Sequence, residues 1–175
     1  MPMFKRSGMP QKMNNLTVLG LDPGIDRLGW ACVSGHSRTD FQCIAAGIIT
    51  TQKENSSAAR LTELYDDLVT LIHTYKPHIV LAEELFFAKN VKTAMTVSEV
   101  RGIIKLAVQQ AQVDYAEINP KTVKKRVTGY GNANKQQIRF VVQQLFAFTE
   151  MPKPDDVADA IAIAYIGLLE HLPLI

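Results

Sequence analysis

Two carboxylates, Asp22 and Glu83, each follow directly on a short, mainly apolar run of the sequence. The run before Asp22 covers residues 16–21, and the run before Glu83 covers residues 78–82. Short apolar runs bounded by turn residues, such as the Pro-Gly pair after Asp22, are typical of buried strands. An unpaired charge at a buried edge costs free energy, so such groups are usually paired with a cation or a metal. Both acids are therefore candidates for a functional site.

Two further acids, Asp156 and Asp159, begin the long apolar stretch over residues 157–169. In a helix, their spacing of three residues puts both on one face. Acids at a helix start also interact favourably with the helix dipole, which is a simpler explanation for this pair alone. That explanation does not account for Asp22 and Glu83. Carboxylates converging from three elements favour a site for Mg²⁺ or Mn²⁺, which accept oxygen ligands.

A carboxylate site of this kind suits phosphodiester hydrolysis. Two divalent ions can assist the attack of water and stabilise the charge on the leaving oxygen, so no side-chain nucleophile is required. The His and Cys residues show neither metal-ligand nor triad spacing. Cys32 and Cys43 are expected to be buried, reduced thiols.

The net charge of +2 conceals an uneven distribution of charge. No acid occurs between Glu117 and Glu150, where the basic residues are Lys121, Lys124, Lys125, Arg126, Lys135 and Arg139. A basic stretch beside an acidic pocket suits a polyanion whose backbone is held by cations while its reacting phosphate meets metal. For any one of these side chains, a solvated basic face is the alternative.

The apolar periodicity predicts one domain with a mixed sheet flanked by helices. Strands are expected over residues 16–22, 29–34, 41–50, 78–85 and 114–118, and helices over about 57–75, 91–110, 134–148 and from 155 onward. Residues 120–131 form a basic segment without a predicted element. Residues 1–15 look like a flexible extension, which leaves 16–175 as the domain.

The chain lacks the features of a membrane or secreted protein. No apolar run approaches the roughly 18 residues of a membrane span. Asp22 interrupts the apolar run after the basic N-terminal residues too early for a signal-peptide core. A cytoplasmic protein is expected.

Several motifs together resemble those of the bacterial RuvC Holliday-junction resolvases. They are Leu21-Asp22-Pro23-Gly24, Ala82-Glu83, Phe86-Phe87-Ala88-Lys89-Asn90, Arg101-Gly102, Gly129-Tyr130-Gly131 and the segment Asp156–Ala162. The resemblance implies a ribonuclease H-like fold with a five-stranded sheet. It also implies a homodimeric, Mg²⁺-dependent endonuclease that resolves four-way DNA junctions by paired symmetric nicks in recombination and repair. The RuvA–RuvB branch-migration proteins are the implied partners.

The resemblance also assigns roles to the four acids. Asp22 would bridge two Mg²⁺ ions, Glu83 would hold one, and Asp156 with Asp159 would hold the other, with Mn²⁺ able to substitute. Asp155 and Glu84 are spare carboxylates that leave the division of ligands open. Because strand side chains alternate, only one of the neighbouring glutamates can face Asp22, and the family motif selects Glu83.

Other positions match the family's contacts with DNA. Lys124 and Lys135 correspond to basic positions near the scissile phosphate, and Lys121, Lys125 and Arg126 are expected to contribute. Phe86 matches an aromatic that inserts beside unstacked bases, and Lys89 lies in the same loop. Phe87 is the expected core residue of the Phe pair, and Tyr130 could either touch DNA or pack.

The family uses the helix over residues 91–110 for dimer contacts, although Met95, Val97, Ile103 and Ile104 there are more simply core residues. Three other functions fit the sequence less well than the resolvase. A YqgF-type nuclease shares the fold and the first aspartate but lacks the Phe-x-Ala-Lys-Asn loop. A catalytically silent junction-binding protein would not need the complete acidic set. An actin-like ATP-binding domain would need more length and a second glycine-rich loop.

Overall fold

The computed structural model of the chain describes residues 15–84 and 91–172, with the backbone alone for residues 91–93. Within these residues, five strands form one sheet of order β3-β2-β1-β4-β5. The strands are β1 Leu16–Asp22, β2 Arg27–Gly35, β3 Phe41–Thr50, β4 Ile79–Glu83 and β5 Asp114–Ile118. The helices are α1 Ser57–Tyr75, α2 Val91–Gln110, α3 Pro120–Thr128, α4 Lys135–Leu145 and α5 Asp155–His171.

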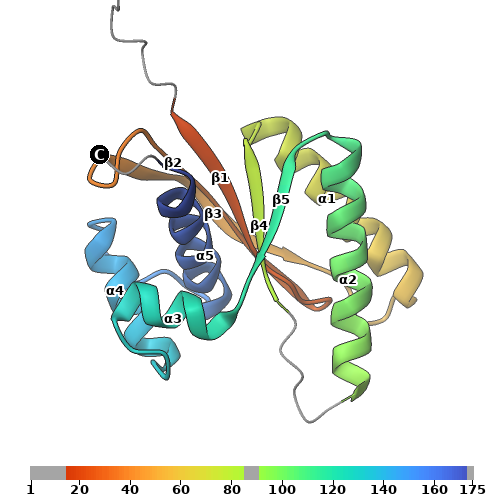
Figure 1. Cartoon of the computed structure of the whole chain (residues 1–175). Coiled ribbons are helices and arrows are strands. Elements are labelled where there is room, and N and C mark those ends of the chain that lie inside the picture. Colours follow the sequence, from red (N-terminus) through yellow and green to blue (C-terminus); the bar gives the residue numbers. More distant parts are fainter. Residues whose placement is uncertain (1–14, 85–90, 173–175) are drawn as a thin grey trace, which may run out of the picture.

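The sheet is mixed, as predicted. Strands β1, β2 and β3 are antiparallel neighbours joined by short turns, whereas β1, β4 and β5 are parallel. Helix α1 leads from β3 to β4, and α2 joins β4 to β5. Parallel neighbours need crossover connections, and helices supply them. Figure 1 shows the sheet between two helical layers, with α1 and α2 on one face and α5, α3 and α4 on the other.

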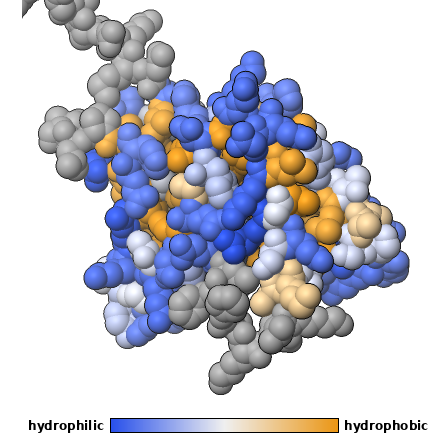
Figure 2. Space-filling model, turned by 45° about the vertical axis from the view of Figure 1, so that its right-hand side comes forward, coloured by the Kyte–Doolittle hydropathy of each residue, from blue (hydrophilic) through white to orange (hydrophobic). Residues whose placement is uncertain are grey.

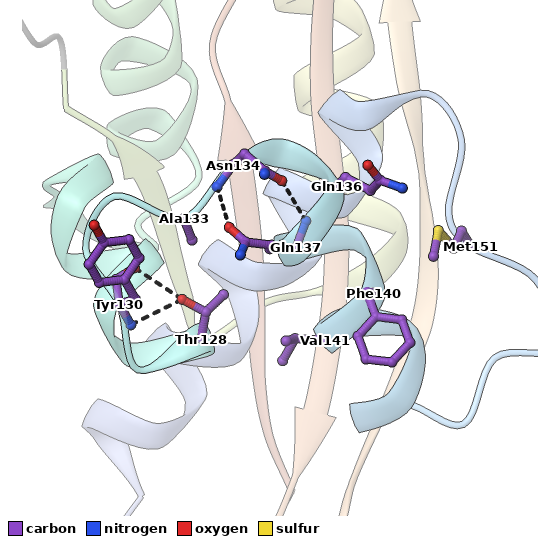
Figure 3. Close-up of a pocket in the computed structure, with 9 residues that line it drawn as sticks. All are labelled: Thr128, Tyr130, Ala133, Asn134, Gln136, Gln137, Phe140, Val141 and Met151. Carbon is purple, nitrogen blue, oxygen red and sulfur yellow. Dashed lines mark hydrogen bonds between the residues drawn. The ribbon is translucent and has the colours of Figure 1, made fainter.

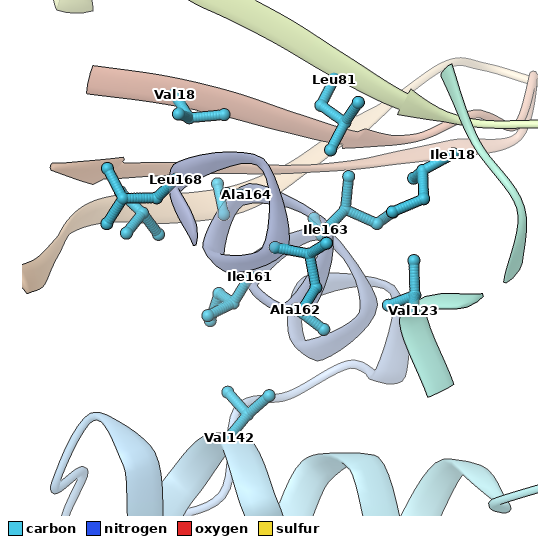
Figure 4. Close-up of a cluster of buried hydrophobic side chains, with 14 of the residues drawn as sticks. Val18, Leu81, Ile118, Val123, Val142, Ile161, Ala162, Ile163, Ala164 and Leu168 are labelled. Carbon is cyan, nitrogen blue, oxygen red and sulfur yellow. The ribbon is translucent and has the colours of Figure 1, made fainter. Parts of the chain in front are cut away.

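Alternating side chains of the strands divide the core into two clusters. Leu19 and Leu21 of β1 pack with α1 and α2, whereas Val18 packs with α5 on the other face. By the same alternation, Asp22 lies on the α5 face of the sheet. Figure 4 shows α5 between the strands that carry Val18 and Leu81 and the helix that carries Val142. Helix α5 is therefore buried on most sides and fixed in position.

Two glycines allow α5 to approach the sheet closely. A Cβ atom at Gly20 would lie 2.4 Å from the backbone nitrogen of Ala164, and one at Gly29 would lie 2.2 Å from the carbonyl oxygen of Asp156. Both distances are shorter than atoms tolerate, so only glycine permits this contact. The start of α5 is thereby held against the ends of β1 and β2, close to Asp22.

Some sequence predictions require correction. The basic segment contains the helix α3, which begins after Asn119, whose side chain accepts a hydrogen bond from the Lys121 N–H at 3.0 Å. The helix ends at Thr128 and is capped by Gly129, whose φ of 79° favours glycine. The helix was missed because it is short and buries only Val123. Helix α4 ends at Leu145, earlier than predicted.

Two further expectations have mixed outcomes. Cys32 is buried, as predicted, but Cys43 is only half-buried; both are free thiols. Ile104 is a core residue, but Met95 is 65% exposed and does not belong to the core. Among the described helices, none is long and apolar enough to cross a membrane. The predicted N-terminal extension lies outside the described residues, apart from Asn15.

Candidate active site

Asp22 and Glu83 end neighbouring parallel strands. The register pairs Leu21 of β1 with Ala82 of β4, so the next residue of each strand is an acid. Both carboxylates lie on the α5 face and line one cavity of about 160 Å³. The other polar side chains of this cavity are Asp159, Lys124 and Lys135.

Glu84 does not line this cavity. Its side chain is exposed and accepts a hydrogen bond from Asn119 Nδ2 at 3.2 Å. Its backbone N–H donates to the carbonyl of Ile118 on β5, which continues the parallel pairing by one residue. Of the two neighbouring glutamates, the structure thus places Glu83 beside Asp22 and Glu84 outside.

The half-buried carboxylates Asp22 and Glu83 are costly to ionise. Burial first, and then the nearby charges of Glu83, Asp159 and Asp156, raise the pKa of Asp22 to about 7. Burial and then Asp159 raise the pKa of Glu83 to about 7. Among the described residues, no hydrogen bond or ion pair engages either of these two carboxylates. Lys135 acts to lower the pKa of both carboxylates, and Lys124 that of Glu83, but neither effect outweighs burial.

The acids of α5 differ from this pair because each has a cationic partner. Asp159 Oδ2 lies 3.8 Å from Lys135 Nζ, and Asp156 Oδ2 lies 3.4 Å from Arg27 Nε. Burial raises the pKa of Asp159, although Lys135 acts in the opposite direction. Asp156 does not line this cavity but lines a second groove.

Asp155, the spare acid of α5, binds to α4. Its carboxylate lies 3.5 Å from Lys135 Nζ and 3.7 Å from Arg139 Nη1. This acid therefore holds Lys135 at the cavity and ties the start of α5 to α4.

The donor set fits a hard divalent cation. Within residues 15–84 and 91–172, no three His, Cys, Asp or Glu side chains already have the spacing of a metal site. The residues that meet here nevertheless offer carboxylate oxygen alone, which is the ligand type that Mg²⁺ and Mn²⁺ prefer. Mutual repulsion, which contributes to the raised pKa values, opposes their closer approach. A cation would reverse that repulsion, and Asp22, Glu83, Asp156 and Asp159 could hold it.

The basic residues separate into groups with different surroundings. Lys124 and Lys135 line the cavity with the acids. Lys121 and Lys125 are exposed on α3, outside the cavity wall. Arg126 forms an ion pair with Glu170 near the far end of α5, so the structure does not bring it to the acids. Phe86, Phe87 and Lys89 lie outside the described residues.

Sequence reasoning missed two exposed side chains near the site. Arg27 contacts Asp156, and its only signal was its position shortly after the Asp22-Pro23-Gly24 turn. Phe140 of α4 is exposed and, with Tyr130, lines a separate cavity of about 370 Å³ beside the start of α4. Figure 3 shows Tyr130 and Phe140 on opposite sides of this cavity, with Gln137 between them. Tyr130 is therefore not a core residue.

The family profile described as Crossover junction endodeoxyribonuclease RuvC matches residues 18–166 of the chain. The chain belongs to the RuvC family. A relative with the same description from Caldicellulosiruptor saccharolyticus is 43% identical over 154 residues, which are 88% of this chain and 93% of the relative. A RuvC relative from Caldanaerobacter subterraneus subsp. tengcongensis is 47% identical over 149 residues, covering 85% of this chain and 90% of the relative.

A solved structure of the family has the same fold. The structure described as Thermus thermophilus RuvC in complex with Holliday junction substrate has a TM-score of 0.81 and 27% identity. The alignment covers 86% of this chain and 91% of that RuvC chain. The resemblance to RuvC and the ribonuclease H-like fold expected from the sequence are thus confirmed.

Proposed function

We propose that this chain is an endonuclease that resolves Holliday junctions by hydrolysing one phosphodiester at the cavity of Asp22 and Glu83. The observation that carries the proposal is this pair of half-buried carboxylates, which form no ion pair with a described residue and share their cavity with Lys124 and Lys135. The RuvC relatives, one of them described in complex with a Holliday junction, support the choice of substrate.

The acids would hold two Mg²⁺ ions. Asp22, Glu83, Asp156 and Asp159 would supply the carboxylate oxygens that hold them. The bound ions would activate water and neutralise charge on the leaving oxygen. Because Asp22 and Glu83 are partly buried and form no ion pair with a described residue, their charge would be available to a cation.

Lys124 and Lys135 would bind the phosphate that enters the cavity. Both line its wall, and Asp155 and Asp159 hold the ammonium group of Lys135 at the rim. Lys121 and Lys125 on the exposed side of α3 would contact phosphates farther along the same strand. Arg126 has a smaller role in this proposal because Glu170 already binds it.

The protein would act as a homodimer through α2. Met95, Gly102 and Leu106 are spaced along one side of this helix; Met95 and Leu106 are exposed, and open space surrounds Gly102. In Figure 2, which brings the α2 side of the molecule forward, hydrophobic residues reach the surface among hydrophilic ones. A symmetric dimer would present two equivalent sites to opposed strands of the junction and produce paired, symmetric nicks.

Three further elements of the proposal rest on the family resemblance. Phe86 would insert beside the unstacked bases at the junction centre, Lys89 would contact the backbone there, and RuvA–RuvB would deliver the junction. Phe86→Ala should slow cleavage more than it weakens binding.

The deciding experiment incubates the purified protein with a mobile four-way junction in Mg²⁺, in Mn²⁺ and in EDTA. Cleavage at symmetric positions is expected with either metal and none with EDTA. Asp22→Asn should abolish cleavage and retain junction binding, because the basic surface stays intact. Linear duplex DNA and structured RNA serve as substrate controls.

Other outcomes would assign a different function. Preferential cleavage of structured RNA would indicate the YqgF-type activity. Binding of the junction without cleavage in either metal would indicate a silent junction-binding protein. Full activity of Asp22→Asn would contradict the role of the carboxylate cavity.

A further inference from the structure

Asp156 lines a second depression of the surface and not the cavity of Asp22 and Glu83, although its charge raises the pKa of Asp22. This groove has a volume of about 420 Å³. Its walls are residues 24–27 of the β1–β2 turn, Thr96 and Val97 of α2, and Asp156 at the start of α5. The groove and the cavity share no residue, and Asp156 is one turn of α5 away from Asp159, which lines the cavity.

Arg27 is the cation of this groove. Its side chain is 55% exposed, and its Nε lies 3.4 Å from Asp156 Oδ2. In the described part of the chain, this is the one ion pair of Arg27, so its two terminal nitrogens have no ion-pair partner. A planar guanidinium with free N–H groups is well suited to bind phosphate through two hydrogen bonds.

The turn that carries Arg27 is held by other contacts. Asp26 pairs with Arg60 and lies 3.4 Å from Lys53 Nζ, and the hydrogen bond from Arg60 lowers the pKa of Asp26. Arg60 also donates to Thr51 Oγ1, which donates to the carbonyl of Ile25 at 2.7 Å. The turn therefore does not need the Arg27–Asp156 contact to keep its shape, and Asp26 does not compete for Arg27.

We propose that this groove binds the DNA backbone beside the scissile phosphate, and that Arg27 exchanges Asp156 for a DNA phosphate when a divalent ion takes Asp156. This inference rests on the proposed nuclease function. The exchange conserves charge pairing, because the ion neutralises Asp156 and the substrate brings a new anion to the freed guanidinium. Cations would then hold the strand on both sides of the acids, with Lys124 and Lys135 at the cavity and Arg27 at the groove.

The exchange predicts opposite effects of Arg27→Gln on metal and on DNA. Without DNA, Mn²⁺ should bind Arg27→Gln about two- to fivefold more tightly in titration calorimetry, because a competing ion pair is removed. With DNA, the variant is combined with Glu83→Gln to prevent cleavage. In Mg²⁺ its junction affinity should fall about three- to tenfold, and the salt slope should decrease by about one. In EDTA, where Arg27 stays on Asp156, the loss should be smaller.

Lys53→Gln is the matched control, since it removes the same charge from a residue after β3 that contacts Asp26 of the same turn. It should change neither metal affinity nor the salt slope at the junction. Melting temperatures of both variants establish that they are folded.

Three results would overturn the proposal. An unchanged junction affinity and salt slope of Arg27→Gln in Mg²⁺ would show that the groove does not bind DNA. Weaker Mn²⁺ binding by Arg27→Gln would show that Arg27 positions Asp156 as a ligand and does not compete with metal. Equal losses of junction affinity in EDTA and Mg²⁺ would show that no exchange occurs. Failure of the nuclease function itself would be distinct, because the wild-type protein would then not cleave the junction.

Discussion

Glu83, the last residue of β4, and Glu117, the last but one of the neighbouring parallel strand β5, have opposite electrostatic surroundings. The register pairs Ala82 of β4 with Glu117 of β5, and Glu83 with Ile118, so the two acids point to opposite faces of the sheet. Burial acts to raise the pKa of both. For Glu117 this effect is overcome by hydrogen bonds from Arg101, Lys105 and Tyr115, which lower the pKa to about 2, whereas the pKa of Glu83 is raised to about 7.

The difference separates a carboxylate that contacts within the fold neutralise from the carboxylate that we propose is functional. On the α2 face, Arg101 contacts Glu117 directly, Lys105 Nζ lies 3.0 Å away, and the Tyr115 hydroxyl donates at 2.8 Å. On the α5 face, the described residues give Glu83 no such partner. A charge that the fold neutralises stabilises the fold, whereas a buried charge that it leaves unneutralised is available to a bound cation.

The largest effect on activity is expected for Glu83, and its neighbour Glu84 provides the comparison. Glu83→Gln should reduce junction cleavage by more than about a hundredfold, because even residues that only support metal ligands contribute about 10–100-fold. Glu84→Gln should keep activity within about threefold, because its side chain is exposed and bonds to Asn119. Single-turnover cleavage in Mg²⁺ measures both. The reverse order of activities would mean that the site uses the other side of β4.

The second prediction compares Glu117 with Glu83 by their effects on stability, where Glu117 should matter more. Glu117→Gln should lower the free energy of unfolding by about 1–3 kcal/mol, because it leaves the half-buried Arg101 without its charged partner. In EDTA at pH 8, Glu83→Gln should be neutral or stabilising, since it removes an uncompensated charge. Urea denaturation followed by circular dichroism tests both. An equal loss of stability in the two variants would mean that Glu83 stabilises the fold as much as Glu117 does.

The third prediction concerns pH. A carboxyl whose folded pKa is raised binds protons more tightly in the folded state, so stability falls as pH rises from about 4 to about 7 for Asp22 and Glu83. In EDTA, the melting temperature should therefore fall between pH 5 and pH 8 by several degrees. Asp22→Asn should flatten this decline, and Mg²⁺ should offset it most at pH 8. Glu117 acts in another window, because its lowered pKa gives stability that is lost as pH falls below about 4.5.

The smallest expected effect tests the cations of the cavity. Lys124→Ala should weaken junction binding by a few-fold and decrease the salt slope by about one, because one phosphate contact is lost. Arg126→Ala is the control, since Glu170 pairs with Arg126 away from the cavity. Fluorescence anisotropy at several salt concentrations measures both slopes. An equal decrease for Arg126→Ala would extend the DNA surface to the far end of α5.

Much of the site could be predicted from local patterns. An apolar run that ends in an acid indicates where a strand leaves the core, and this placed Asp22 and Glu83 at strand ends. The alternation of strand side chains required Glu83 and Glu84 to point to opposite faces. The spacing of Asp156 and Asp159 required one face of a helix. These features depend on backbone geometry over a few residues, which the sequence alone determines.

Other features depended on contacts between distant segments. The parallel register that sets Leu21 beside Ala82, and so Asp22 beside Glu83, is decided by how whole strands pack. The closeness of α5 to the sheet depends on Gly20 and Gly29, and nothing in their local sequence names the helix that meets them. The contact of Arg27 with Asp156 and the pairing of Arg126 with Glu170 also required the folded chain. The sequence by itself therefore determined which residues could do chemistry. The tertiary structure decided which of their charges the fold neutralises, because the pairing of opposite charges depends on distances between elements far apart in the chain.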